Sequence, residues 1–187
     1  VLVRNAEALE RLASADTVVI DKTGTLTEGR PAVTAVDVFP GFFRGDIHAV
    51  AAAVEQGSEH PLAAAIVTAA RDRRLAIEPV EDFRAYPGRG VGGKVAGRRV
   101  LLGNAALMEE QGVRFGERPA LYAERLRNGE TVMLIAVDGK PAGMMALADP
   151  VRPSARAAVE ELQALGFAVI MASGDNAAVA AKAAGDV

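Results

Sequence analysis

The sequence predicts an α/β protein in which a parallel-sheet domain is interrupted by an inserted α+β module. Two short, continuous apolar runs, at 17–20 and 167–171, are typical of parallel strands that are buried on both faces. Between them, alternating strand patterns and hairpin turns indicate an antiparallel sheet with helices. We therefore expect the two ends of the chain to form one domain and residues 32–147 to form a second.

The composition excludes several classes of protein. Of the 187 residues, 50% are hydrophobic and 24% are charged, which provides a packed core and rules out a disordered chain. The formal net charge of -3 argues against a protein that binds nucleic acid or a membrane surface. The absence of cysteine excludes disulfides, thiolate metal sites and cysteine nucleophiles. No apolar run approaches the roughly 18 residues of a membrane-spanning helix, and the start without methionine leads us to expect a piece of a longer protein.

The two flanks are expected to hold strands and helices in alternation. Helices are expected at 5–13, 153–165 and from about 177, and strands at 17–20 and 167–171. Asn5 is the expected cap of the first helix, and Gly166 closes the amphipathic second one.

The inserted module has its own pattern of elements. Strands are expected at 33–39, 91–96, 98–102, 131–137 and 142–147, and helices at 46–56 and 61–74. The pair Asp138-Gly139 is a strong hairpin signal, and Pro61 begins a helix at a position where its missing N–H is harmless.

Asp21 lies where open α/β sheets collect their reactive groups, directly beyond the carboxyl end of a strand. An aspartate in water is already an anion at neutral pH, so it can attack phosphorus without a general base. Ser173 and Gly174 end the second apolar strand, where a hydroxyl and a backbone N–H could hold phosphoryl oxygens. An isolated aspartate at such a place more often caps a turn, so the residues around Asp21 decide between the two interpretations.

The string Asp21-Lys22-Thr23-Gly24-Thr25-Leu26-Thr27 resembles the phosphorylation signature of the P-type ATPases, ion pumps of the haloacid dehalogenase superfamily. Ser173-Gly174-Asp175-Asn176 resembles the second motif of that family, with serine in place of the usual threonine, and Asp149-Pro150 also fits. The resemblance implies a haloacid dehalogenase-like, Rossmann-like phosphorylation domain. Its implied catalytic residues are Asp21, Lys22, Thr23, Ser173, Gly174 and Asp175.

Thr23 distinguishes a pump from a phosphatase. Phosphatases of the superfamily generally carry an aspartate two residues after the nucleophile, where it acts as general acid and base. A threonine at that position cannot donate or accept a proton near neutral pH. The resemblance therefore implies a slowly hydrolysed phosphoenzyme, which a pump needs and a metabolic phosphatase does not.

The segment from Glu55 to Leu62 resembles the Ser-x-His-Pro-Leu motif of heavy-metal (type IB) pumps. The resemblance implies an adenine pocket shaped by Glu55, His60, Gly88 and Gly90. An imidazole can stack on or hydrogen-bond to a purine, and glycines let a ligand approach the backbone closely. The two glycines with Gly93 also match a dinucleotide fingerprint, but they precede a strand instead of opening a helix, so we reject that interpretation.

Other polar and sulfur-containing side chains are given structural roles. A lone histidine is more often a cap or surface residue than a ligand, and we interpret His48 only in that way. Arg71, Arg73 and Arg74 are expected to form a solvated helix end, and the five methionines to fill the core.

Two motifs of the family's phosphorylation domain do not occur in this sequence. They are a later lysine that helps to bind phosphate and a Gly-Asp-Gly-x-Asn-Asp loop that supplies an aspartate to Mg²⁺. Lys182 follows Asp175 too soon to be that lysine. The resemblance leaves Asp21 and the Thr23 carbonyl as ligands of an incomplete Mg²⁺ site, so we expect a C-terminally truncated domain with weak or no activity by itself.

We expect residues 1–31 and 148–187 to form the phosphorylation domain, and residues 32–147 to form the nucleotide-binding domain, of a heavy-metal pump. General similarity favours the copper and silver branch. ATP and Mg²⁺ are the implied cofactors. The implied partners are the transmembrane and actuator domains of a membrane-embedded parent, on the cytoplasmic side, with no nucleic acid. Two alternatives stay open: a soluble phosphohydrolase with a cap module, which Thr23 argues against, and a non-catalytic nucleotide-binding module.

Overall fold

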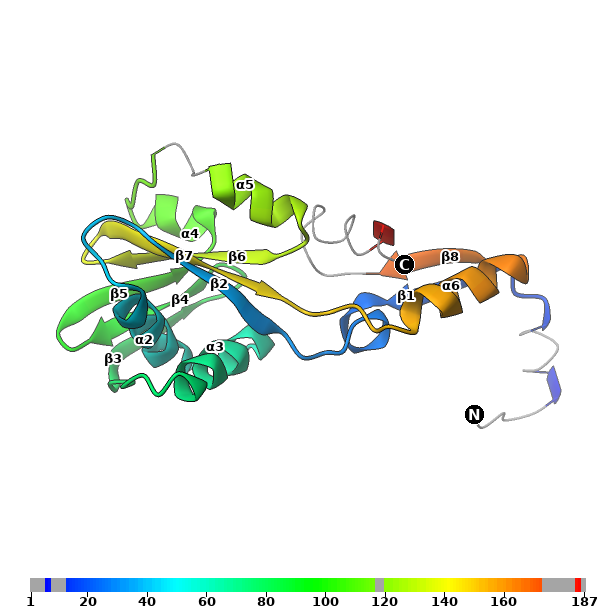
Figure 1. The fold of residues 1–187 in the computed structure, drawn as a ribbon, viewed down its shortest axis with the longest axis horizontal. Helices are drawn as coiled ribbons and strands as arrows, with labels where there is room; N and C mark the ends of the chain where they lie inside the picture. The colour runs from blue at the N-terminus through cyan, green and yellow to red at the C-terminus, as the bar shows by residue number, and fades with distance from the viewer. Residues whose placement is uncertain (1–5, 8–12, 117–119, 173–183, 186–187) are drawn as a thin grey trace. The chain divides into compact units, whose positions relative to one another are not determined.

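The computed structural model describes residues 6–7, 13–116, 120–172 and 184–185 (Figure 1). The chain forms two compact units, of which unit 1 comprises residues 1–29 and 149–187 and unit 2 comprises residues 30–148. Most of the helix expected at 5–13, and the helix expected from about 177, lie outside the described residues.

Unit 2 is built on a six-stranded antiparallel sheet in the order β2-β7-β6-β5-β4-β3. The strands are β2 (Ala32–Val38), β3 (Val80–Tyr86), β4 (Gly90–Val95), β5 (Arg98–Gly103), β6 (Thr131–Val137) and β7 (Lys140–Ala148). Both predicted hairpins, β4–β5 and β6–β7, are present. Asp138 and Gly139 have φ angles of 50° and 74°, as the tight turn between β6 and β7 requires. The antiparallel sheet predicted for the inserted module is confirmed.

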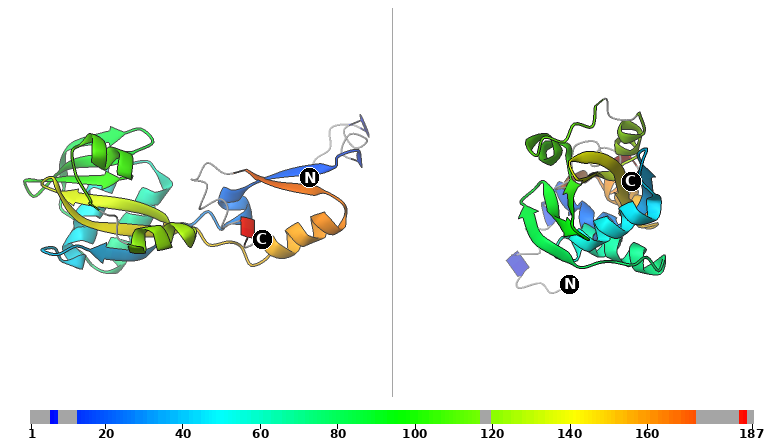
Figure 2. Two further views of the ribbon diagram at one scale, coloured as in Figure 1. Left: turned by 90° about the horizontal axis from the view of Figure 1, so that it is seen from above. Right: turned by 90° about the vertical axis from the view of Figure 1, so that its left-hand side faces the viewer.

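Two pairs of helices cover the two faces of this sheet (Figures 1 and 2). They are α2 (Arg44–Glu55) and α3 (Pro61–Asp72) on one face, and α4 (Ala105–Glu110) and α5 (Ala120–Arg127) on the other. Side chains alternate between two cores, so that Leu102 packs with α2 and α3 while Leu101 packs with α4. Neither β3 nor the second pair of helices is predicted from the sequence.

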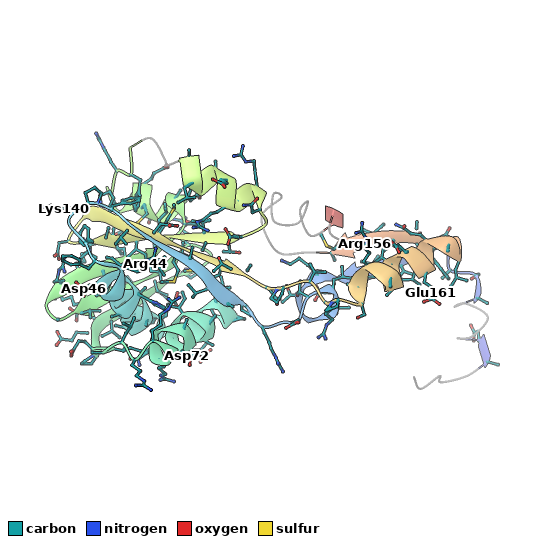
Figure 3. All side chains as sticks on the ribbon, in the orientation of Figure 1. Arg44, Asp46, Asp72, Lys140, Arg156 and Glu161 are labelled. Carbon is teal, nitrogen blue, oxygen red and sulfur yellow. The ribbon has the colours of Figure 1, made fainter. Side chains whose placement is uncertain are left out.

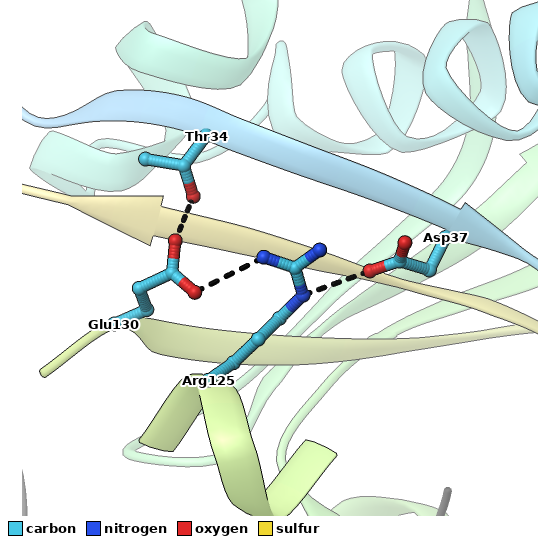
Figure 4. Close-up of polar contacts among 4 residues, drawn as sticks. All are labelled: Thr34, Asp37, Arg125 and Glu130. Carbon is cyan, nitrogen blue, oxygen red and sulfur yellow. Dashed lines mark hydrogen bonds and ion pairs between the residues drawn. The ribbon is translucent and has the colours of Figure 1, made fainter. Parts of the chain in front are cut away.

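A partly buried cluster of charges connects α5 to the sheet (Figure 4). Nε of Arg125 lies 2.9 Å from Oδ2 of Asp37 on β2, and its Nη1 lies 3.1 Å from Oε2 of Glu130. Thr34 donates a hydrogen bond to the other oxygen of Glu130. No residue of α5 is fully buried, so these contacts add to the packing of its partly buried Tyr122 and Leu126 against the core.

Unit 1 contains a parallel pair of strands, β1 (Thr17–Asp21) and β8 (Ala168–Ala172), and the helix α6 (Ala155–Ala164). The predicted burial of these strands on both faces is wrong. Side chains of Ile20, Val169 and Met171 pack with α6. Val19 and Ile170 on the other face are 64% and 52% exposed, because the described part of unit 1 covers only one face with a helix.

The outer surfaces of the helices are polar. Charged side chains such as Asp46 on α2, and Arg156 and Glu161 on α6, lie on exposed sides (Figure 3). Within the described ranges, no helix has the length and apolar character needed to cross a bilayer.

Candidate functional site

Asp21 is the last residue of β1 and its side chain is exposed. Strand β1 pairs in parallel with β8, and the residue opposite Asp21 is Ala172. Ser173 is the next residue in the sequence, but Ser173, Gly174 and Asp175 lie outside the described residues. Asp21 therefore stands at the carboxyl end of a parallel strand, as the sequence analysis expected.

A wide turn, η1 (Lys22–Leu26), follows Asp21. The backbone N–H of Thr27 closes the turn by donating to the carbonyl of Lys22 at 3.0 Å. Gly24 has a φ of 78°, a left-handed conformation that favours glycine. The Lys22 side chain is buried, whereas Thr23 is exposed beside the nucleophile candidate.

The buried side chain of Thr27 stabilises this turn. Its fully buried hydroxyl accepts a hydrogen bond from the N–H of Gly24 at 3.1 Å and donates to Oδ2 of Asp149 at 2.6 Å. The short distance is typical of a hydroxyl that donates to a carboxylate. Both residues lie within motifs of the sequence, but no role is predicted for either from the sequence alone.

Arg152 supports the same turn from the other flank. Its Nε donates to the carbonyl of Thr27 at 2.9 Å and its Nη2 to that of Gly24 at 3.2 Å, while its backbone N–H donates to Leu26. Three donors of one residue thus bind three backbone carbonyls of the loop after Asp21. No pattern in the sequence pointed to Arg152, because this pairing depends on the approach of residues far apart in the chain.

Glu55 is the last residue of α2 and is only 3% exposed. One of its carboxylate oxygens, Oε2, has no hydrogen-bond partner within the protein. Burial raises the pKa of Glu55, and a hydrogen bond with the Ser58 side chain offsets part of that effect. A buried carboxyl group with an unused oxygen fits a ligand that brings its own polar hydrogen.

The loop after Glu55 is a hydrogen-bonded unit. The Ser58 N–H donates to the carbonyl of Glu55 at 3.0 Å, and the Ser58 hydroxyl accepts from the N–H of His60 at 3.3 Å. Nδ1 of His60 accepts from the N–H of Leu62 at 3.2 Å and so caps α3. Since Nδ1 is an acceptor, the neutral imidazole carries its hydrogen on Nε2, and the exposed ring can still present that N–H to a ligand.

Gly88 lies in the turn between β3 and β4 and Gly90 is the first residue of β4, and each position suits glycine for a different reason. Gly88 has a φ of 68° and open space around its α-carbon. At Gly90, a β-carbon would lie 2.2 Å from the carbonyl oxygen of Leu102, so the neighbouring strand already requires glycine there. The side chain of Asn104 donates to the carbonyl of Gly88 at 3.1 Å and accepts from the N–H of Leu107, which ties the turn to α4.

The interpretation of His48 as a cap or surface residue is wrong. His48 is 1% exposed on the inner side of α2, because its helix packs against α3 there. Its Nε2 lies 3.2 Å from the carbonyl oxygen of Ile66, and Nη1 of Arg73 lies 2.9 Å from its Nδ1. Arg73 is therefore exposed but bound to a buried histidine, so it is more than a solvated helix end.

The residues around Asp21 fit a magnesium ion by the chemistry of their donors. The Asp21 carboxylate and the Thr23 carbonyl are hard oxygens, which Mg²⁺ prefers. In the part of the chain that the structure describes, no three acidic, histidine or cysteine residues are grouped to hold a metal ion without further ligands.

Residues 15–186 match the family model of the haloacid dehalogenase-like hydrolases. The chain is 45% identical, over 99% of its length, to a copper-exporting P-type ATPase of Legionella pneumophila, of which it covers 25%. It is 43% identical, over 94% of its length, to a silver exporting P-type ATPase of Salmonella typhimurium, of which it covers 21%. The chain thus spans about a quarter of the length of these relatives.

The solved structures that resemble this chain are also P-type ATPases or domains of them. The chain superposes with a TM-score of 0.72 and 40% identity on a zinc-transporting PIB-type ATPase, covering 95% of this chain and 29% of that one. Against a catalytic CPx-ATPase domain the TM-score is 0.71 at 27% identity, with 99% of this chain and 62% of that one covered. The N-domain of a copper-transporting P-type ATPase matches 64% of this chain over 99% of its own length, with a TM-score of 0.54 and 31% identity.

Proposed function

Because the chain belongs to the haloacid dehalogenase-like hydrolase family, and its relatives are metal-exporting P-type ATPases, we propose that it is the ATP-binding and phosphate-accepting part of such a pump. Unit 2 is the nucleotide-binding domain and unit 1 belongs to the phosphorylation domain. Copper or silver is the proposed cargo. The parent's transmembrane and actuator domains are the proposed partners, on the cytoplasmic side of a membrane.

The observation that carries this proposal is the placement of Asp21. Its exposed carboxylate lies on the last residue of β1, and the turn after it is fixed by Thr27, Asp149 and Arg152. Phosphoryl transfer depends mainly on positioning and on neutralising charge, so a rigid backbone behind the nucleophile favours the reaction. Asp21 attacks the terminal phosphorus of ATP, an aspartyl phosphate forms and ADP leaves. Mg²⁺, when bound, supplies positive charge to the phosphoryl oxygens.

The unpaired oxygen of Glu55 is suited to accept a hydrogen bond from ATP. The amino group of adenine can donate to Oε2, which supports a base-binding site at the loop from Glu55 to His60. His60 offers Nε2–H or its ring face to the base. Gly88 leaves open space at the following turn, whereas the glycine at position 90 is explained by strand packing alone.

Phosphorylation is tested in the full-length protein with ATP labelled on its terminal phosphate. Asp21→Asn should abolish acid-stable, hydroxylamine-sensitive labelling, because a neutral amide is a poor nucleophile. Asp16→Asn, at an exposed aspartate outside the site, should keep the label. Labelling of the Asp21 variant would remove Asp21 from the mechanism. Rapid hydrolysis of simple phosphate esters by the wild type would favour a phosphohydrolase instead.

Nucleotide binding is tested on the 187-residue chain by calorimetry. His60→Ala should lower ATP affinity about 5- to 150-fold, the equivalent of losing one stacking or polar contact of roughly 1–3 kcal/mol. Equal ATP affinity in both proteins would remove His60 from the site.

A further inference from the structure

Phe83 is brought to the loop after Glu55 by an irregularity in strand β3. Glu81 pairs with Lys94 and Arg84 pairs with Gly92, so two residues of β3, Asp82 and Phe83, stand opposite a single residue of β4. Asp82 has a φ of 51°. A bulge of this kind changes the direction of the side chains at that point of a strand.

The residue opposite the bulge must be glycine. A β-carbon on Gly93 would lie 2.4 Å from Cγ2 of Val80 and 3.0 Å from the carbonyl oxygen of Glu81. Nζ of Lys94 lies 2.7 Å from Oδ2 of Asp82 and joins the two strands at the same place. The bulge is therefore a fixed feature of the sheet.

The ring of Phe83 lies against Gly57, in the middle of the loop from Glu55 to His60. A β-carbon on Gly57 would lie 2.9 Å from Cδ2 and 3.0 Å from Cγ of Phe83. The φ of Gly57 is outside the left-handed region, so its backbone would accept alanine. The three atoms nearest to that β-carbon all belong to the Phe83 ring. Phe83 as a whole is 38% exposed.

We propose that Phe83 is a positioning residue for nucleotide binding. Its ring contacts the loop at Gly57 and thereby fixes the positions of Glu55 and His60. This inference rests on the proposed base-binding site. Ser58 hydrogen-bonds to Glu55 on one side and to His60 on the other, so a shift at Gly57 moves both residues together. The side chain that shapes this site therefore comes from β3, not from the motif itself.

The test is a double-mutant cycle on the 187-residue chain, with ATP and GTP titrated by calorimetry. Gly57→Ala should lower ATP affinity about 5- to 10-fold, because the new methyl group displaces the loop from the ring. Phe83→Leu should have an effect of similar size. In the double variant the losses should be less than multiplicative, because leucine makes room for the methyl group.

The ratio of ATP to GTP affinity separates positioning from a general loss of stability. The ratio should fall in Gly57→Ala and in Phe83→Leu, since the loop that contacts the base has moved. Phe83→Tyr should have the wild-type ratio because it keeps the ring. Gly45→Ala is the matched control on α2, because its β-carbon would meet only Leu75 Cδ2 at an ordinary 3.9 Å. Its ATP affinity should equal that of the wild type.

Failure of the base-binding site and failure of the role of Phe83 would give different results. If the wild-type chain binds no ATP, the base-binding site itself is wrong. If the wild type binds ATP while the Gly57 and Phe83 variants keep its affinity and its ATP-to-GTP ratio, the role of Phe83 is overturned. Strictly multiplicative losses would also overturn it. If Gly57→Ala does not fold, Phe83→Leu against Phe83→Tyr decides by the same ratio.

Discussion

Glu55 is costly for the fold and, in the proposed base-binding site, useful for a ligand. Its carboxyl group is buried at the end of α2 with one oxygen unsatisfied. An unpaired buried polar atom costs free energy unless something binds to it. In the proposed base-binding site, a hydrogen-bond donor on the base would satisfy this oxygen.

Glu55→Gln should change how stability depends on pH. Burial raises the pKa of Glu55 above its ordinary value of 4.5, so its contribution to stability is complete below that value and is lost as the pH rises through the higher folded-state pKa. The variant should gain stability relative to the wild type between about pH 5 and pH 8. Urea denaturation at both pH values measures the difference. Glu59→Gln, at an exposed site, should show no such trend.

Gly88 and Gly90 should respond differently to substitution, since only one of them is confined by a neighbouring strand. Gly90→Ala should destabilise the protein by about 3 kcal/mol or more, because its β-carbon collides with backbone atoms of β5. Gly88→Ala should cost about 1–2 kcal/mol through its positive φ alone. Thermal unfolding of both variants checks this order. Equal losses would mean that β5 moves to accommodate the side chain.

At the scale of elements, the pair α2 and α3 is joined by a polar contact inside its interface. His48 binds the Ile66 carbonyl with one nitrogen and Arg73 with the other. Because Arg73 can only donate, Nδ1 of His48 must be the acceptor, and Nε2–H is the donor to Ile66. This arrangement needs the neutral imidazole.

His48 should make the protein less stable in mild acid. Burial lowers the pKa of His48 from its ordinary 6.5, the Ile66 carbonyl opposes this, and the charge of Arg73 adds to the lowering. Its contribution to stability is therefore present above pH 6.5 and is lost as the pH falls towards the folded-state pKa. Denaturation midpoints should drop between about pH 7.5 and pH 5.5 in the wild type and much less in His48→Gln.

His60→Gln is the matched control, because the sequence contains only these 2 histidines. It should keep the acid-dependent loss. If the two variants behave alike, a group other than His48 is responsible.

At the scale of the whole molecule, unit 2 has the features of an independently folding domain. The chain enters it through β2 and leaves through β7, and Ala32 pairs with Ala148 where the two connections meet. Its two cores lie on either side of one sheet and draw on residues 30–148 alone. Chain ends that lie close together and a hydrophobic core formed by its own residues are characteristic of an inserted domain.

Residues 30–148 expressed alone should therefore unfold in one cooperative thermal transition and bind ATP within about twofold of the 187-residue chain. Calorimetry measures both properties. A broad transition, or a tenfold weaker affinity, would show that unit 2 depends on residues of unit 1.

The sequence by itself determined the local chemistry: the string that begins at Asp21, the capped start of α3 at Pro61 and the turn at Asp138-Gly139 are all patterns of neighbouring residues. Tertiary structure decided what depends on distant residues. Strand β3 has little apolar alternation, so its place comes from pairing with β4. The support of the Asp21 turn by Arg152, the burial of His48 and the contact between Phe83 and Gly57 each join segments well separated in the chain. Such contacts form only when the sheet brings those segments together, and no short-range pattern encodes them.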